Sequence, residues 1–164
     1  SEADEPAAFA PEIRRAELSC GAGAKEAEST AVLLPAKAET GLKSAKRVVI
    51  CGHGMGGAEK VQSARDLAKA FSASLGGTRP AAIDGWIDHS QLVGISGSFI
   101  KPEICIVLGA SGARAFAAGV RESGLMIAVN TDETAAIFRM SDAGAVCDCA
   151  EFAAELAKLI EANT

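Results

Sequence analysis

Histidine is scarce in this sequence, and the scarcity bears on metal binding. The chain has two histidines among 164 residues, and its five cysteines include one close pair, Cys147-x-Cys149. Zinc sites in proteins are commonly built from two such pairs, with a longer spacing, or from a cysteine pair and a histidine pair. Because the second pair is missing and the spacing is a single residue, the sequence predicts no metal site.

Long apolar runs and clusters of basic residues are also missing. No run approaches the roughly 18–20 apolar residues that a membrane-spanning helix requires. The 16 basic and 21 acidic side chains give a net charge of −5. Nucleic acids and anionic membranes attract proteins through clustered Lys and Arg. We therefore expect neither a nucleic-acid partner nor insertion into a membrane.

The cysteines that are present occupy apolar surroundings. Cys51, Cys105 and Cys147 each lie inside a strand-like apolar run. This placement is typical of buried free thiols in a reducing compartment. We expect a cytoplasmic protein, or a protein of the mitochondrial matrix if the source is a eukaryote.

The chain divides into a lead-in and a main domain. Residues 1–46 are rich in Ala and Glu, and within them residues 12–20 and 29–34 are predicted to form two short strands of a hairpin. Residues 47–164 carry the stronger patterns and are predicted to form one domain. A chain of this length has room for a single core that buries about 70% of the unfolded surface.

Apolar runs alternate with helical patterns along the main domain. The runs that are predicted to be strands are residues 47–51, 103–108, 126–129 and 143–147. After the first run, one apolar stripe continues as far as Leu75 and predicts a helix that Gly76-Gly77 ends. Strands that alternate with helices predict an α/β fold, a three-layer Rossmann-like parallel sheet with helices on both faces.

Ligands of such sheets bind at the carboxyl ends of the strands. The first predicted strand is followed by GHGMGG and the second by GASGAR, and glycine turns of this kind let backbone N–H groups face phosphate oxygens. The first turn formally matches G-x-G-x-x-G, but Asp66 lies mid-helix, so the acid that binds the ribose in ordinary NAD sites is missing. Two glycine turns at one sheet edge predict a nucleotide site, and a nicotinamide dehydrogenase is disfavoured.

Residues 76–97, GGTRPAAIDGWIDHSQLVGISG, gather many special backbone positions in one stretch. Arg79, between Thr78 and Pro80, is predicted to lie at a strand start and to contact a ligand. Trp86 is predicted to anchor the packing, and His53 and His89 are predicted to be polar loop residues.

These motifs together resemble one family. Residues 47 to about 160 resemble the C-terminal, FAD-binding domain of the electron transfer flavoprotein alpha subunit. The family's GASRPAVDAGW is similar to Gly76–Trp86, its GISGAIQH to Gly109–Phe116 and its AINKDPEAPIF to Ala128–Phe138. Its QVGQTGK is similar to the segment around residues 91–97, and its ADYGIVGDL to Ser141–Cys149.

The resemblance implies a cofactor and the residues that bind it. The cofactor is FAD, with Arg79 against the isoalloxazine ring and the Ser96 hydroxyl near flavin N5. The pyrophosphate and ribose end is expected at Ser111–Ala115, Asn130 and Asp148. The full set of implied cofactor-binding residues is His53, Thr78, Arg79, Val93, Gly94, Ile95, Ser96, Ser111, Gly112, Ala113, Arg114, Ala115, Phe116, Asn130, Asp148 and Cys149.

The resemblance also implies a role and partners. The expected role is to pass electrons between a dehydrogenase and an acceptor through bound flavin, without a substrate of the protein's own. The expected partners are an electron transfer flavoprotein beta-like subunit and an acyl-CoA or other flavin dehydrogenase. The alternative is a redox-silent assembly module that holds AMP, or FAD as structure only.

Three positions depart from the family pattern. His53 replaces an arginine, Ile95 replaces a glutamine, and Phe116 replaces a histidine that donates to the pyrimidine edge of the flavin. Phenylalanine has no hydrogen-bond donor. We therefore expect the anionic flavin to be poorly stabilised unless His53 or Arg114 substitutes for the missing donor.

Overall fold

The computed structural model describes residues 41–164, and a five-stranded sheet forms its centre. All four strand pairs are parallel, and the strand order is β2-β1-β3-β4-β5. The strands are β1 (Arg47–Cys51), β2 (Ser74–Gly77), β3 (Ile104–Leu108), β4 (Leu125–Asn130) and β5 (Ala143–Val146). The α-helices are α2 (Ala58–Ala70), α3 (Arg79–Ile83), α4 (Arg114–Val120) and α5 (Cys149–Ala162). The predicted three-layer α/β Rossmann-like fold is confirmed.

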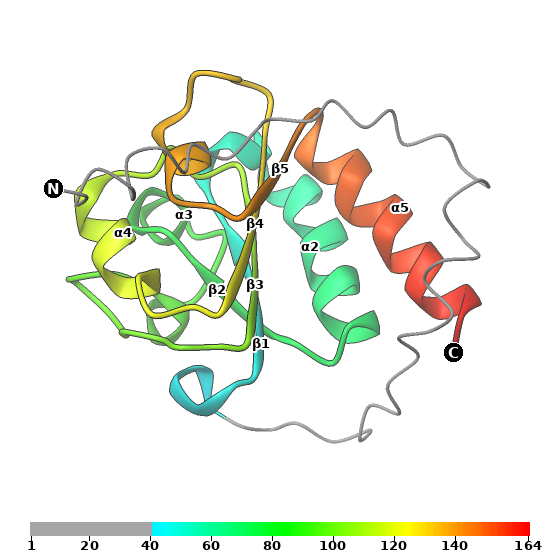
Figure 1. Cartoon of the computed structure of the whole chain (residues 1–164), viewed down its shortest axis with the longest axis horizontal. Helices are drawn as coiled ribbons and strands as arrows, with labels where there is room; N and C mark the ends of the chain where they lie inside the picture. The colour runs from blue at the N-terminus through cyan, green and yellow to red at the C-terminus, as the bar shows by residue number, and fades with distance from the viewer. Residues whose placement is uncertain (1–40) are drawn as a thin grey trace, which may run out of the picture.

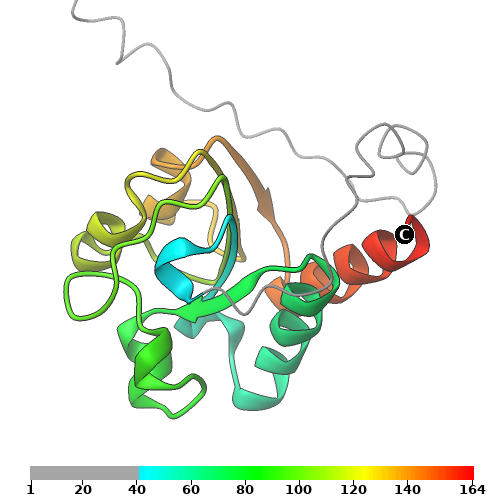
Figure 2. The ribbon, with the colours of Figure 1, turned by 90° about the horizontal axis from the view of Figure 1, so that it is seen from below.

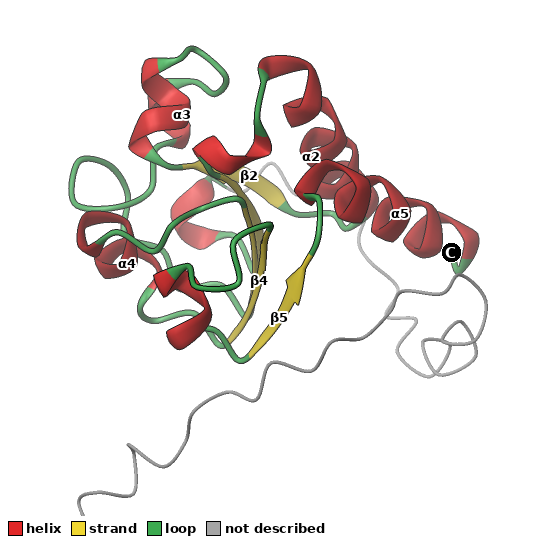
Figure 3. Cartoon of the chain, turned by 90° about the horizontal axis from the view of Figure 1, so that it is seen from above, coloured by secondary structure: helices red, strands yellow, loops and turns green. Residues whose placement is uncertain are grey.

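The sheet is covered on both faces. Helices α2 and α5 lie side by side against one face, and α4 lies on the other (Figures 1 and 3). Neighbouring residues of a strand point to opposite faces. Val49 therefore belongs to the core under α2 and α5, whereas Val48 and Ile50 belong to the core under α4. Burial on both faces explains why RVVIC is a continuous apolar run.

Helix α2 is shorter than its apolar stripe predicts. It ends at Ala70, and Ser72 then has a φ of 52°, which ends the helix with a left-handed residue. The N–H of Ala73 donates to the carbonyl of Ala68 across this turn (2.7 Å). Leu75 lies in β2 and pairs with Val49 of β1. The prediction of a helix as far as Leu75 was wrong, because an inward-facing Leu suits a strand equally well.

Two glycines belong to β2 rather than to a helix stop. A Cβ atom on Gly76 would lie 3.0 Å from Ile50 Cδ1, and one on Gly77 would overlap the Ile87 side chain. The edge strand is therefore made of SLGG because its neighbours approach the backbone closely.

The chain path creates one crevice at the carboxyl edge of the sheet. From β1 the chain passes through α2 to β2 on one side, and later returns to β3 on the other side of β1. The strand order thus reverses between β1 and β3, and ligands of open α/β sheets bind at such a point. Figure 2 shows the chain from below, with α2 and α5 again adjacent.

The described part begins just before the sheet. A short 3-10 helix, η3 (Leu42–Ser44), leads to Ala45, which is buried in the core under α4. The predicted hairpin of residues 12–20 and 29–34 lies outside the described residues, as does Cys20. The division at residue 47 stays a prediction. Over residues 41–164, every helix is too short or too polar to traverse a lipid bilayer.

Candidate functional site

A cavity of about 820 Å³ opens at the carboxyl edge of the sheet. Its walls are the turns that follow β1, β2, β3 and β4, together with the loop at residues 92–96 and the first residues of α4. Cofactor pockets in proteins measure roughly 300–1,000 Å³. The predicted site residues that line it are His53, Thr78, Arg79, Val93, Gly94, Ile95, Ser96, Ser111, Gly112, Ala113, Ala115, Phe116 and Asn130.

The turn after β1 is packed backbone to backbone on the turn after β3. The N–H of Gly52 donates to the carbonyl of Leu108 (2.7 Å), and the N–H of Gly54 donates to that of Gly109 (2.8 Å). A Cβ on Gly54 would lie 2.7 Å from the Gly109 carbonyl oxygen. These two glycines of the G-x-G-x-x-G pattern therefore serve the contact between the turns.

Two further glycines hold the opposite wall. Gly94 has a φ of 129°, and a Cβ there would lie 2.6 Å from the carbonyl oxygen of Ala115. Gly112 has a φ of 90°, and a Cβ there would overlap the backbone of Ile137. The N–H of Ile137 donates to the Ser111 carbonyl (3.0 Å). The position of this wall is thus fixed by main-chain contacts.

Thr78 and Arg79 form the wall after β2. Thr78 is 6% exposed, and its hydroxyl oxygen has no hydrogen-bond partner. An unpaired buried hydroxyl costs roughly 1–3 kcal/mol. Arg79 is exposed and is the first residue of α3. The prediction that Arg79 starts a strand was wrong: β2 has already ended, and Pro80 suits the first turn of a helix.

Asn130, at the end of β4, joins two turns. Its Nδ2 donates to the carbonyl of Ala110 (3.0 Å), and its Oδ1 accepts the N–H of Asp132 (3.0 Å). Asp132 Oδ1 in turn accepts from the Thr134 hydroxyl and N–H. These two bonds lower the pKa of Asp132 below its ordinary value, so this wall carries a fixed negative charge.

The predicted site residues omit the cavity wall that follows Asn130. Asp132, Thr134, Ala135 and Ala136 all line the cavity. The polar residues that follow the strand at 126–129, and the AINKDPEAPIF resemblance, were the signals that could have found them.

Two of the three positions that depart from the family pattern carry apolar side chains on the cavity lining. Phe116 lines the cavity, but it is 5% exposed and packs in the core under α4 with Val93 and Val120. Ile95 lines the cavity too, and 64% of it is exposed to solvent. The wall at these two positions is therefore apolar.

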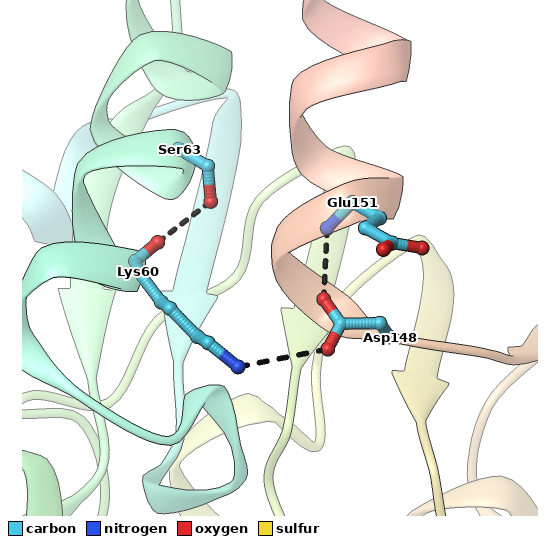
Figure 4. Close-up of polar contacts among 4 residues, drawn as sticks. All are labelled: Lys60, Ser63, Asp148 and Glu151. Carbon is cyan, nitrogen blue, oxygen red and sulfur yellow. Dashed lines mark hydrogen bonds and ion pairs between the residues drawn. The ribbon is translucent and has the colours of Figure 1, made fainter.

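Three predicted residues lie outside the cavity lining. Arg114 is the first residue of α4. Asp148 caps α5 by accepting the N–H of Glu151 (2.9 Å), and its other oxygen lies 3.8 Å from Lys60 Nζ (Figure 4). Cys149 donates to the carbonyl of Val129 (3.3 Å), and burial raises the pKa of its thiol to about 12.

Metal ligands do not converge in the described part of the chain. No three His, Cys, Asp or Glu side chains within residues 41–164 gather closely enough to hold an ion.

Comparison with known proteins identifies the family. Residues 41–121 match the family model described as Electron transfer flavoprotein FAD-binding domain. The chain is 38% identical over 115 residues to Protein FixB of Clostridium saccharobutylicum, covering 70% of this chain and 34% of that protein. It is 37% identical over 120 residues to Lactate dehydrogenase (NAD(+),ferredoxin) subunit LctC of Acetobacterium woodii, covering 73% and 29%. Electron transfer flavoprotein subunit alpha of Paracoccus denitrificans is 36% identical over 115 residues, covering 70% and 37%.

The parallel sheet and its edge cavity define an α/β protein of the nucleotide-binding class. Within that class, the chain belongs to the electron transfer flavoprotein alpha family and carries that family's FAD-binding domain. It spans about a third of the length of the curated relatives it matches.

The cavity fits FAD on three counts. Thr78 lines the space, and its buried hydroxyl lacks a partner that a ligand atom could supply. Gly94 and Gly112 line the cavity, and their close packing on the backbone of Ala115 and Ile137 fixes the wall that a planar ring or a phosphate would contact. Arg79 supplies an exposed cation for an anionic or electron-rich group.

Proposed function

We propose that this chain holds FAD in the edge cavity as the flavin-binding part of an electron transfer flavoprotein. The observation that carries the proposal is that Thr78 and Arg79, which are consecutive in the sequence, both line the cavity. Thr78, whose buried hydroxyl has no partner, is followed by the exposed Arg79, and both residues line a space of cofactor size. An unpaired buried group is costly in the free protein, so a ligand that pairs it gains affinity.

Bound FAD would supply the ability to accept and release electrons singly or in pairs. Arg79 would place a positive charge against the ring or its anionic edge, and the Ser96 hydroxyl would donate to a ring nitrogen. Backbone N–H groups of Ser111–Ala113 would contact the pyrophosphate. Leu92 and Phe116 would keep water from that side of the ring.

The adenosine end of FAD would extend beyond the described lining. Asp148 and Cys149 follow β5 at the same edge of the sheet and remain our candidates for contacts to it. Arg114, at the start of α4, remains a candidate for the phosphates.

A partner subunit would complete the site. Ile95 lies at the cavity with most of its surface in water, and Phe99, later in the same loop, is 59% exposed. We propose that an electron transfer flavoprotein beta-like subunit closes over the cavity, and that an acyl-CoA or other flavin dehydrogenase donates electrons. We place the protein in a reducing compartment, the cytoplasm or the mitochondrial matrix, in keeping with four free cysteines in the described part of the chain.

The test is FAD binding by the purified full chain, with and without the partner that copurifies with it. We expect a yellow complex with the partner, release of FAD on denaturation, and weak retention by the chain alone. Colourless protein that ignores added FAD with the partner present would refute the proposal.

AMP serves as the competing ligand in the same titration. A redox-silent module would bind AMP about as tightly as FAD. An electron carrier should prefer FAD, because the isoalloxazine ring of FAD would contact Thr78 and Arg79. Dithionite should bleach the bound flavin reversibly.

A further inference from the structure

The imidazole of His53 is held by two contacts from one short segment. His53 lies in the 3-10 helix η4 (His53–Met55), directly after β1 and on the lining of the cavity. Its Nε2 lies 3.0 Å from Asp84 Oδ2. Its ring stacks on Trp86, with centroids 5.2 Å apart and planes inclined by 5°. Neither Asp84 nor Trp86 lines the cavity itself.

The two contacts constrain different motions of the ring. Stacking on Trp86 sets the plane of the imidazole, and the bond to Asp84 sets its rotation within that plane. With Nε2–H directed to the carboxylate, Nδ1 is the ring nitrogen that takes no part in this bond. Trp86 is itself held, because Arg65 Nη2 donates to its carbonyl oxygen (2.8 Å).

The charged side chains on the elements near His53 are carboxylates, a lysine and an arginine. Arg79 begins α3 and Asp84 directly follows its last residue. Lys60 comes from α2, Asp148 and Glu151 lie at the start of α5, and Asp132 lies on the cavity lining. Carboxylates, lysine and arginine ordinarily keep one charge between about pH 5.5 and 8.

The neighbouring thiols also stay uncharged. Burial raises the pKa of Cys51 and of Cys149 to about 12, and burial raises the pKa of Cys147 as well. Within the described residues, His53 is the one histidine on the cavity lining, and histidine is the residue type that ordinarily changes charge in this pH range.

We infer that Asp84 and Trp86 are positioning residues that fix His53 at the cavity, where its proton-dependent positive charge faces an anionic group of the bound dinucleotide. This inference rests on the proposed function. It assigns a pH-dependent affinity to the FAD site and places its origin in a contact between the β1 turn and the end of α3.

The experiment measures the dissociation constant of FAD for the full chain with its copurifying partner from about pH 5.5 to 8. We expect affinity to fall by about three- to fivefold as pH rises, in line with one partly exposed charge contact. Two variants bracket the wild type. His53→Arg should keep the low-pH affinity throughout, and His53→Gln should keep the high-pH affinity throughout, both with a flat profile.

Asp84→Asn separates positioning from simple charge. If Asp84 merely neutralises His53, removing its charge strengthens binding of an anion at low pH. If Asp84 positions the ring, the variant binds FAD more weakly than the wild type at low pH, which is the result we expect.

His89→Gln is the matched control, because His89 is the only other histidine in the sequence and does not line the cavity. It should keep the wild-type profile. A wild-type affinity that is independent of pH, or a profile unchanged in His53→Gln, would overturn the inference and leave FAD binding intact. Absence of FAD binding at every pH would instead count against the proposed function.

Discussion

Two glycine turns lie at the same edge of the sheet, and they do different things. The turn at residues 52–57 follows β1 and matches the dinucleotide pattern, whereas the turn at residues 109–114 follows β3 and matches it poorly. Yet the second turn lines the cavity over five consecutive residues, 109–113, and the first contributes only His53 and Gly54. Gly57 caps α2 outside the cavity lining.

The difference shows what the glycines of the first turn are for. Gly52 and Gly54 face the backbone of Gly109 at distances that leave no room for a side chain. The glycine pattern is therefore explained by a close contact between two turns. That contact holds the turn after β3 in place. A glycine motif alone does not say which turn meets the ligand.

Breaking the contact between the turns should have the largest effect. Gly109 and Gly85 have nearly the same φ, 71° and 76°, but a Cβ on Gly109 would lie 2.6 Å from Gly54 C, whereas Gly85 has open space. Gly85→Ala should cost roughly 1–2 kcal/mol of unfolding free energy from backbone strain alone. Gly109→Ala should cost about 3 kcal/mol or more, because overlap adds to strain. Urea unfolding measures both, and equal losses would contradict the contact.

Removing the cation of the β2 wall comes next. Arg79→Ala should weaken binding of reduced FAD by about 10- to 100-fold, because a charge-assisted contact contributes roughly 1.5–3 kcal/mol. Arg121→Ala is the control, since Arg121 is also exposed but lies at the end of α4, away from the cavity lining. Flavin titrations that give both variants the same affinity would make Arg79 an ordinary surface residue.

The Thr78 hydroxyl should show opposite effects on folding and on binding. Thr78→Val removes a buried group without a partner, so the free protein should gain up to about 1 kcal/mol of unfolding free energy. The same change should weaken FAD binding by roughly 2- to 10-fold, because one hydrogen bond is lost. A variant that is less stable and binds FAD normally would show that the hydroxyl serves the fold instead.

The ion pair between the start of α2 and the start of α5 should matter least. Lys60, in the first turn of α2, lies 3.8 Å from Asp148, and both side chains are more than a third exposed. Solvent screens such a pair, so Lys60→Met should change the unfolding free energy by less than about 1 kcal/mol. Thermal unfolding measures this, and a larger loss would mean that the pair holds α2 and α5 together.

Strands buried on both faces were predictable, and the edge strand was not. RVVIC and EICIVL are continuous apolar runs, so β1 and β3 follow from composition and length. β2 reads SLGG, with one apolar side chain, and Leu75 also continues the helical stripe of α2. Only the neighbours of Gly76 and Gly77 make this segment a strand, and local pattern does not contain them.

The cavity-lining residues also divide into a predictable part and an unpredictable part. Ser111 follows a strand that the sequence predicts, so topology leads to it, and it lines the cavity. Thr78 and Arg79 also line the cavity, but they follow the unpredicted strand β2 and were suggested by the family resemblance rather than by topology. The wall at residues 134–136 depends on the bond from Ile137 N–H to the Ser111 carbonyl, which joins distant segments. The stack of His53 on Trp86 is a tertiary contact of the same kind.

The central claim is that the turn after β3 forms more of the surface that meets FAD than the patterned turn after β1, which contributes only His53 and Gly54. FAD titration of two variants of the full chain tests it most directly. Ser111→Trp places an indole in the cavity from an exposed position, whereas Gly57→Ala adds a methyl group at an extended backbone, where only the flexible Glu59 carboxylate is near. We predict that Ser111→Trp weakens FAD binding by about 100-fold or more and that Gly57→Ala leaves it unchanged. Loss of binding in Gly57→Ala with normal binding in Ser111→Trp would contradict the account.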